Sequence, residues 1–207
     1  MRRFALLLLL IILLPGCVAA DPLTDPIYNT EGYYRLDASG NGGYYHEHII
    51  DVISISPGGS GATQITPNAS SLGGYQLNAI NELLYFNGHV EDDWDTVTDG
   101  ILEIYFEVND DNSAGLVTDT VDLQVETWHK MEGETVCTVY SLSGSTVVGQ
   151  SQQHDLFIQE IAVTNLRVKE VIAFRLNLNT IFSEVDDIIV NHIVFAYQSM
   201  SPSQEVS

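Results

Sequence analysis

Residues 101–108 read Ile101-Leu102-Glu103-Ile104-Tyr105-Phe106-Glu107-Val108, and this stretch predicts the fold class. Apolar side chains occupy every second position from Leu102 to Val108, and Glu103, Tyr105 and Glu107 stand between them. Successive side chains of a β-strand point to opposite faces of the sheet. The alternation therefore predicts a strand with one buried face and one face in water.

The same pattern extends along the chain in both directions. In residues 121–130, the apolar Val121, Leu123 and Val125 alternate with Asp122, Gln124, Glu126, Trp128 and Lys130. Further strands are predicted at 44–55, 134–142, 155–163, 171–179 and 188–198. Residues 77–84 allow either a short helix or the approach to a strand, and residues 164–170 either a loop or one helical turn. About eight to ten strands and few helices predict an all-β antiparallel β-sandwich, jelly-roll-like in its type.

The first 20 residues predict an export signal. Arg2 and Arg3 precede an apolar run, 4–14, that is too short to span a bilayer. Leu14-Pro15-Gly16-Cys17 resembles a bacterial lipobox, although Pro15 departs from the usual small or aliphatic residue. The resemblance implies a lipid-modified Cys17 and a location in the cell envelope, with membrane contact only through that anchor. Cleavage after Val18-Ala19-Ala20 is the alternative, and it predicts an unlipidated extracellular protein.

The remaining chain reads as one domain. Residues 21–32 contain two prolines and no periodicity, which predicts a tether. A single β-sandwich domain is expected over 33–198, followed by a frayed polar tail over 199–207.

The charge balance excludes some partners. The chain has 28 acidic and 7 basic residues, and without Arg2 and Arg3 the exported part has five basic residues and a net charge of −23. Binding to nucleic acids or to anionic lipid surfaces requires clustered Lys and Arg side chains on the protein. The folded domain is therefore not expected to bind either partner. The charge favours cations or a basic partner.

Two acidic loops are candidate calcium sites. Asp92, Asp93 and Asp95 form the first, and Asp110, Asp111 and Asn112 form the second. Hard cations such as calcium prefer carboxylate and amide oxygens, so calcium is the cofactor that we expect. The alternative is that these residues only form turns, where Asp and Asn are common.

A histidine pair is the sharpest signal for a transition metal. His46 and His48 are two residues apart on a predicted strand, so both imidazoles share a face and reach one ion. The alternative is an exposed pair without a ligand. Nucleophile elbows, phosphate loops and dinucleotide fingerprints are absent from the sequence, so no catalytic residue is predicted.

Three aromatic residues are candidate partner contacts: Tyr105, Trp128 and Trp94. If strands 101–108 and 121–130 pair as a hairpin, Tyr105 and Trp128 lie near each other on its wet face. Exposed aromatic side chains are typical anchors for a glycan, a protein surface or a second copy of the chain. Alternatively, another sheet, a loop or a neighbouring subunit covers them.

Part of the chain resembles jelly-roll structural proteins of tailed phages. In that family an acidic Asp-Trp-Asp turn precedes a long strand, as in residues 85–95 followed by 101–108, and residues 186–197 resemble its closing strand. The resemblance covers half of the chain and implies a jelly-roll fold and a virion structural role. It implies no catalytic residues, and an export leader departs from the pattern of a virion component.

These observations favour an exported, lipid-anchored, non-enzymatic β-sandwich that binds or assembles at a surface. The alternatives are a secreted carbohydrate-active or metal-dependent enzyme on a jelly-roll scaffold and a phage-type virion protein. A pocket that holds both His46 and His48 with a carboxylate favours the enzyme. A flat aromatic face favours the binding protein.

Overall fold

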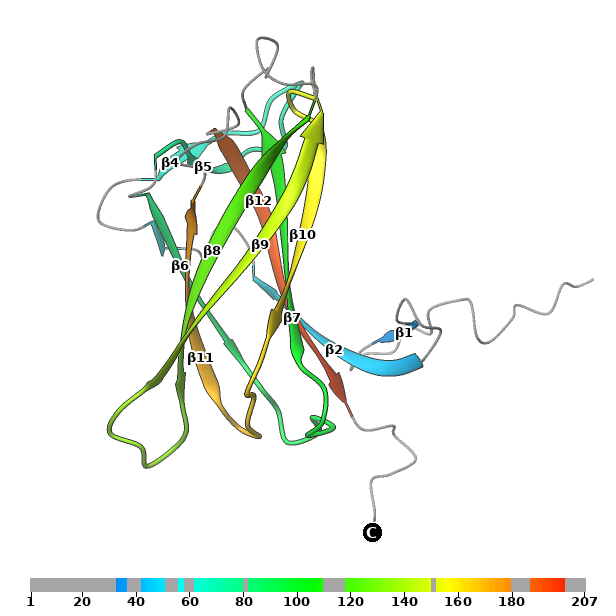
Figure 1. Cartoon of the computed structure of the whole chain (residues 1–207), viewed down its shortest axis with the longest axis vertical. Coiled ribbons are helices and arrows are strands. Elements are labelled where there is room, and N and C mark those ends of the chain that lie inside the picture. Colours follow the sequence, from blue (N-terminus) through cyan, green and yellow to red (C-terminus); the bar gives the residue numbers. More distant parts are fainter. Residues whose placement is uncertain are drawn as a thin grey trace, which may run out of the picture.

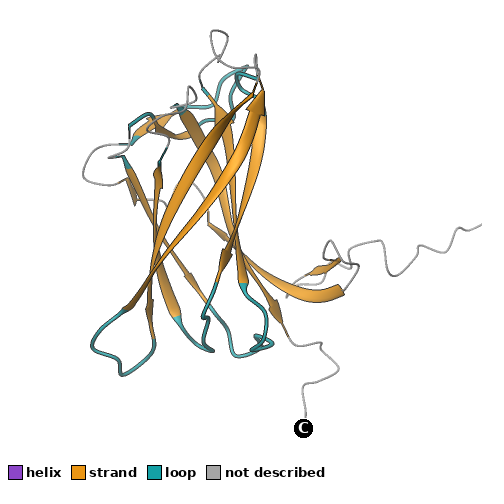
Figure 2. Cartoon of the chain, viewed as in Figure 1, coloured by secondary structure: helices purple, strands orange, loops and turns teal. Residues whose placement is uncertain are grey.

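The computed structural model describes residues 33–36, 42–50, 56–57, 62–79, 82–109, 118–149, 152–179 and 187–199. In this part of the chain all regular structure is β-strand, and no helix is long and apolar enough to cross a membrane (Figure 2). The predicted leader, tether and tail beyond residue 199 lie outside the described residues. So do Cys17 and the loop residues Asp110, Asp111 and Asn112.

The strands form two sheets. The seven-stranded sheet contains β1 (Tyr33–Leu36), β2 (Gly42–Ile50), β4 (Thr63–Ile65), β5 (Gly74–Leu77), β7 (Gly100–Val108), β10 (Leu156–Val163) and β12 (Ile188–Ser199). The five-stranded sheet contains β3 (Ser56–Pro57), β6 (Leu83–His89), β8 (Thr118–Lys130), β9 (Thr138–Gly149) and β11 (Val171–Leu178).

The two sheets pack face to face as an antiparallel β-sandwich of the jelly-roll type, as predicted. In the first sheet β12 pairs with β7 on one side and with β2 and β5 on the other. In the second sheet β11 lies between β6 and β8, and β9 follows β8. In Figure 1 the long strands β8 and β9 cross in front of β7 and β12.

The core lies between the inner faces of the sheets. Leu102, Ile104, Phe106 and Val108 of β7 are fully buried, and so are Val121, Leu123 and Val125 of β8. An aromatic cluster joins the layers: Phe174 of β11 stacks on Phe86 of β6 with 5.0 Å between ring centroids, and it lies 5.6 Å from Phe195 of β12. Because apolar and polar side chains alternate along each strand, each sheet has one apolar face, and the two apolar faces meet in the core.

Most predicted strands are confirmed within a few residues of their ends. The strand predicted at 134–142 begins only at Thr138 and continues to Gly149. The helix alternative at 77–84 is wrong, because Leu77 ends β5 and Leu83 begins β6. Residues 164–170 form a loop with turns.

The hairpin considered for 101–108 and 121–130 does not form. β7 pairs with β10 and β12 in one sheet, whereas β8 pairs with β9 and β11 in the other. The expected wet face of β7 is also covered in part, because Glu103 and Glu107 are buried. Glu107 Oε1 accepts hydrogen bonds from the Leu72 backbone N–H and the Asn191 side chain, whereas its buried Oε2 has no hydrogen-bond partner among the described residues and lies 3.8 Å from His154 Nδ1.

Candidate functional site

The outer face of the five-stranded sheet carries a group of aromatic, charged and hydroxyl side chains on four adjacent strands. We call it the aromatic platform. Its members are Tyr85 and Asn87 of β6, Ala173 and Arg175 of β11, Glu126 and Trp128 of β8, and Val139 and Ser141 of β9. Each belongs to the set of alternate residues that point away from the core.

Trp128 lies near the middle of the aromatic platform. Ala173 is its register partner on β11 and Val139 on β9, and both neighbours are small beside an indole. The Arg175 guanidinium carbon lies 5.5 Å from the centre of the indole, and Arg175 Nη2 lies 2.5 Å from Glu126 Oε2. A guanidinium over an aromatic ring is a favourable cation–π arrangement, so this chain of contacts orients the half-buried ring.

Tyr85 is the second aromatic residue of the platform, and 38% of it is exposed. It is the register partner of Arg175, which places it two strands and two residues away from Trp128. With strand spacings of about 4.8 Å and a rise of about 3.4 Å per residue, the two Cα atoms are about 12 Å apart. Val139, the β9 neighbour of Trp128, is 51% exposed, so this side of the indole is open to solvent.

The other two aromatic candidates lie elsewhere. Tyr105 is half-buried on the outer face of the opposite sheet, where its hydroxyl donates to Glu103 and its ring meets His192. Trp94 is 8% exposed, belongs to the core and donates from Nε1 to the Thr98 carbonyl oxygen. Of the three aromatic candidates, only Trp128 therefore lies on the platform.

The carboxylates of the first acidic loop point to three different partners. Asp92 pairs with Lys169 at 3.0 Å, and this hydrogen bond lowers the pKa of the Asp92 carboxyl. Asp93 lies 3.1 Å from His46 Nδ1. Asp95 accepts hydrogen bonds from the Val97 and Thr98 backbone N–H groups, as is usual in a turn. Calcium binding by Asp92, Asp93 and Asp95 stays a prediction.

His46 belongs to a cluster around the buried Tyr197 hydroxyl. This hydroxyl lies 3.0 Å from His46 Nδ1, accepts from the Glu91 backbone N–H and donates to Asp93 Oδ1. Burial is the main cause that raises the pKa of Tyr197. The His46 and His48 rings are 6.2 Å apart between centroids, and His46 is engaged by Asp93 and Tyr197.

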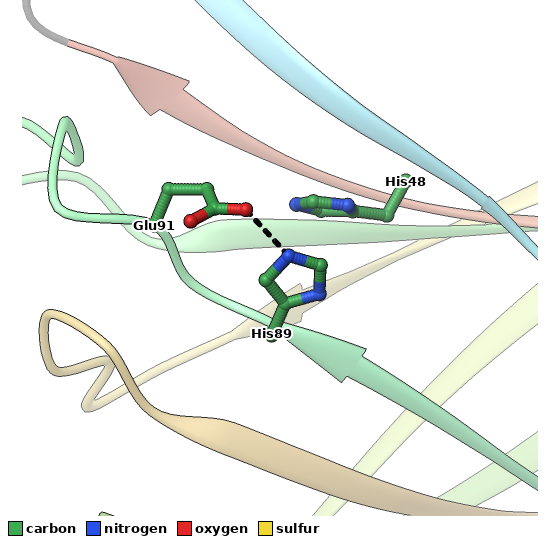
Figure 3. A group of neighbouring side chains, drawn as sticks. All are labelled: His48, His89 and Glu91. Atoms are coloured by element: carbon green, nitrogen blue, oxygen red, sulfur yellow. Dashed lines mark hydrogen bonds and ion pairs between the residues drawn. The ribbon is translucent and has the colours of Figure 1, made fainter.

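His48 has a different set of neighbours, which Figure 3 shows. Its ring lies 4.1 Å from that of His89, at the end of β6, and His89 Nε2 lies 2.6 Å from Glu91 Oε1. One ligand atom from each of His48, His89 and Glu91 lies within 4.8 Å of the others. Desolvation, followed by the charges of His89 and His46, lowers the pKa of His48 to about 4. His48 is therefore a neutral imidazole at pH 7.

The sequence did not single out several of these residues. Tyr85, Arg175 and His89 lie on strands whose order cannot be read from periodicity. The only local signal for the histidine cluster is His89-Val90-Glu91, which repeats the two-residue spacing of His46 and His48.

No protein-family model matches the chain, and no curated protein matches it. A carbohydrate-binding module, CBM36, in complex with calcium and xylotriose aligns with a TM-score of 0.41 and 13% identity over 72% of this chain and 98% of that one. The xylan-binding module CBM15 aligns with a TM-score of 0.41 and 11% identity over 75% of this chain and 98% of that one.

The stem and receptor-binding domain of the spike protein P1 from bacteriophage PM2 also aligns, with a TM-score of 0.33 and 11% identity. That alignment covers 84% of this chain and 95% of the spike domain. At TM-scores this low the likenesses indicate nothing about the function of this chain.

Proposed function

We propose that this chain is a non-enzymatic binding protein that holds a glycan across the aromatic platform. The observation that supports this most directly is the oriented, half-buried indole of Trp128 on the outer face of the sheet, with Tyr85 about 12 Å away. Large aromatic side chains on an open face are typical contact anchors.

The polar residues around Trp128 match the chemistry of a sugar. A saccharide presents apolar C–H faces and many hydroxyl groups, so it needs a ring to stack on and both donors and acceptors nearby. Arg175 donates only, Glu126 accepts only, and Asn87 and Ser141 do both. These side chains lie around the indole on four adjacent strands and offer hydrogen bonds in both directions.

The first prediction concerns Trp128. Replacing Trp128 by Ala is expected to weaken glycan binding about tenfold or more, because the stacking surface is lost. The fold is expected to persist, with the free energy of unfolding changed by about 1 kcal/mol or less, since the ring lies outside the core. A screen on a glycan array, followed by calorimetric titration with the best ligand and by urea unfolding, measures both quantities.

Val147→Ala is the matched control, because Val147 is 63% exposed on β9, outside the platform. It is expected to leave both glycan affinity and stability unchanged. Wild-type protein that binds no glycan on a broad array, or a Trp128→Ala variant with unchanged affinity, contradicts the proposal. Self-association in sedimentation that Trp128→Ala abolishes would show that the platform binds a second copy of the chain, as an assembling or virion protein requires.

We further propose export to the cell envelope with a lipid on Cys17. The support is the basic start, the short apolar run and the Gly16-Cys17 junction of the sequence. Intact-mass measurement of protein expressed in a bacterium is expected to give a mature chain that begins at Cys17 and carries acyl mass. A terminus at Asp21 without acyl mass would contradict the anchor and still support export.

A further inference from the structure

The histidine cluster lies where one edge of each sheet meets the other. His48 belongs to β2 of the seven-stranded sheet, and His89 ends β6 of the five-stranded sheet, with Glu91 just beyond it. In Figure 3 the three side chains converge from these two strands and the segment that follows β6. No backbone ladder between β2 and β6 joins the sheets at this edge in the described residues, since β2 pairs with β1 and β12.

We propose that His48, His89 and Glu91 bind one divalent transition metal ion of the zinc class, which joins the two sheets at this edge. The proposal is independent of glycan binding. Two imidazoles and one carboxylate are a common set of three protein ligands for zinc, with water in the fourth position. Their ligand atoms already lie within 4.8 Å of one another, so small side-chain movements bring all three within about 2.1 Å of one ion.

The surroundings of His48 also point to a missing partner. Its Nε2 atom is buried and has no hydrogen-bond partner among the described residues. A buried polar atom without a partner is uncommon because it loses the hydrogen bond that water would provide. The ring is held in place by Phe195 and Tyr197, whose centroids lie 6.3 and 5.7 Å from it. A metal bond to this nitrogen would satisfy the buried atom.

The kind of ligand selects the kind of ion. Calcium and magnesium prefer oxygen ligands, whereas imidazole nitrogen suits zinc, copper and nickel. The strongly negative chain attracts cations of every kind, so charge alone does not explain selectivity. Because two of the three ligands are nitrogen, zinc is expected to bind when calcium is present in excess.

Titration of zinc into the metal-free full chain tests the proposal. Calorimetry in a buffer with excess calcium is expected to show one zinc ion bound, and the melting temperature is expected to rise, because the ion binds only the folded state. His48→Gln and His89→Gln are each expected to weaken zinc binding roughly tenfold or more. Removing a residue that only hydrogen-bonds to a metal ligand already weakens binding by about that factor.

His154→Gln is the matched control, because His154 lies in the turn before β10, 3.8 Å from Glu107 of β7 and away from the cluster. It is expected to bind zinc like the wild type. Melting curves in chelator show whether each variant is folded, and a variant that is folded without metal gives a valid affinity. Absence of zinc binding by the wild type overturns the proposal. The proposal is also overturned if folded His89→Gln still binds zinc and His46→Gln does not. That result would assign the ion to His46 and His48 on β2.

Discussion

Replacement of Glu170 by Ala is expected to lower the free energy of unfolding by about 3–5 kcal/mol, because it leaves the buried His129 and the half-buried Arg167 without the carboxylate that they contact. Glu170 is fully buried, and its Oε2 atom lies 2.9 Å from Nδ1 of the buried His129. Its Oε1 atom accepts two hydrogen bonds from the Arg167 guanidinium, at 2.8 and 2.5 Å. The carboxylate thus joins β8 to the loop that precedes β11.

The surrounding contacts explain why the structure cannot easily relax around this loss. The His129 ring is buried and its Nε2 already contacts the Thr127 hydroxyl at 2.8 Å, so water does not readily replace the lost carboxylate at Nδ1. Arg167 also holds Glu134, and this hydrogen bond lowers the pKa of Glu134 to about 2.

Urea unfolding at neutral pH measures the difference between wild type and Glu170→Ala. Glu132→Ala, an exposed glutamate in the 131–134 turn, is the control and is expected to stay within about 0.5 kcal/mol of the wild type. A loss below about 1 kcal/mol for Glu170→Ala would show that the network contributes little.

Replacement of Phe174 by Ala is expected to lower the free energy of unfolding by about 3–5 kcal/mol, the usual range for a buried phenylalanine. Phe174 is fully buried, stacks on Phe86 within its own sheet and contacts Phe195 of the opposite sheet. The cavity left by the ring therefore opens between the layers, where three aromatic residues meet.

Asn87→Ala is the control for this change, because Asn87 is an exposed residue of β6 on the opposite face of the same sheet. It is expected to change stability by about 0.5 kcal/mol or less. Comparable losses for the two variants in urea unfolding would mean that the two faces of this sheet were assigned the wrong way round.

Local alternation was enough to predict strands and their inner faces. Leu102, Ile104 and Phe106 were placed inside by their period of two alone, and the structure confirms this. Alternation records only which side of a strand is apolar, and that property depends on residues next to each other in the chain. The all-β sandwich class follows from the number of such strands.

Strand partners could not be predicted in the same way. Strands β7 and β8 follow each other in the chain, yet they lie in opposite sheets. The backbone N–H and C=O groups that join strands are the same whatever the side chains are. The periodicity of the side chains therefore does not indicate which two strands pair. That is why Tyr105 and Trp128 were expected on one face and lie on opposite faces of the sandwich.

The sequence by itself determined that this chain is acidic and that it builds a sandwich with the apolar faces of its strands turned inward. Only the tertiary structure decided that Trp94 lies in the core, that Glu107 and Glu170 are buried, and that His48 meets His89 and Glu91. The physical reason is that burial of a polar or aromatic side chain depends on which distant segment covers it. His48 and His89 are separated by about 40 residues of chain, and only the packing of one sheet on the other brings their imidazoles together.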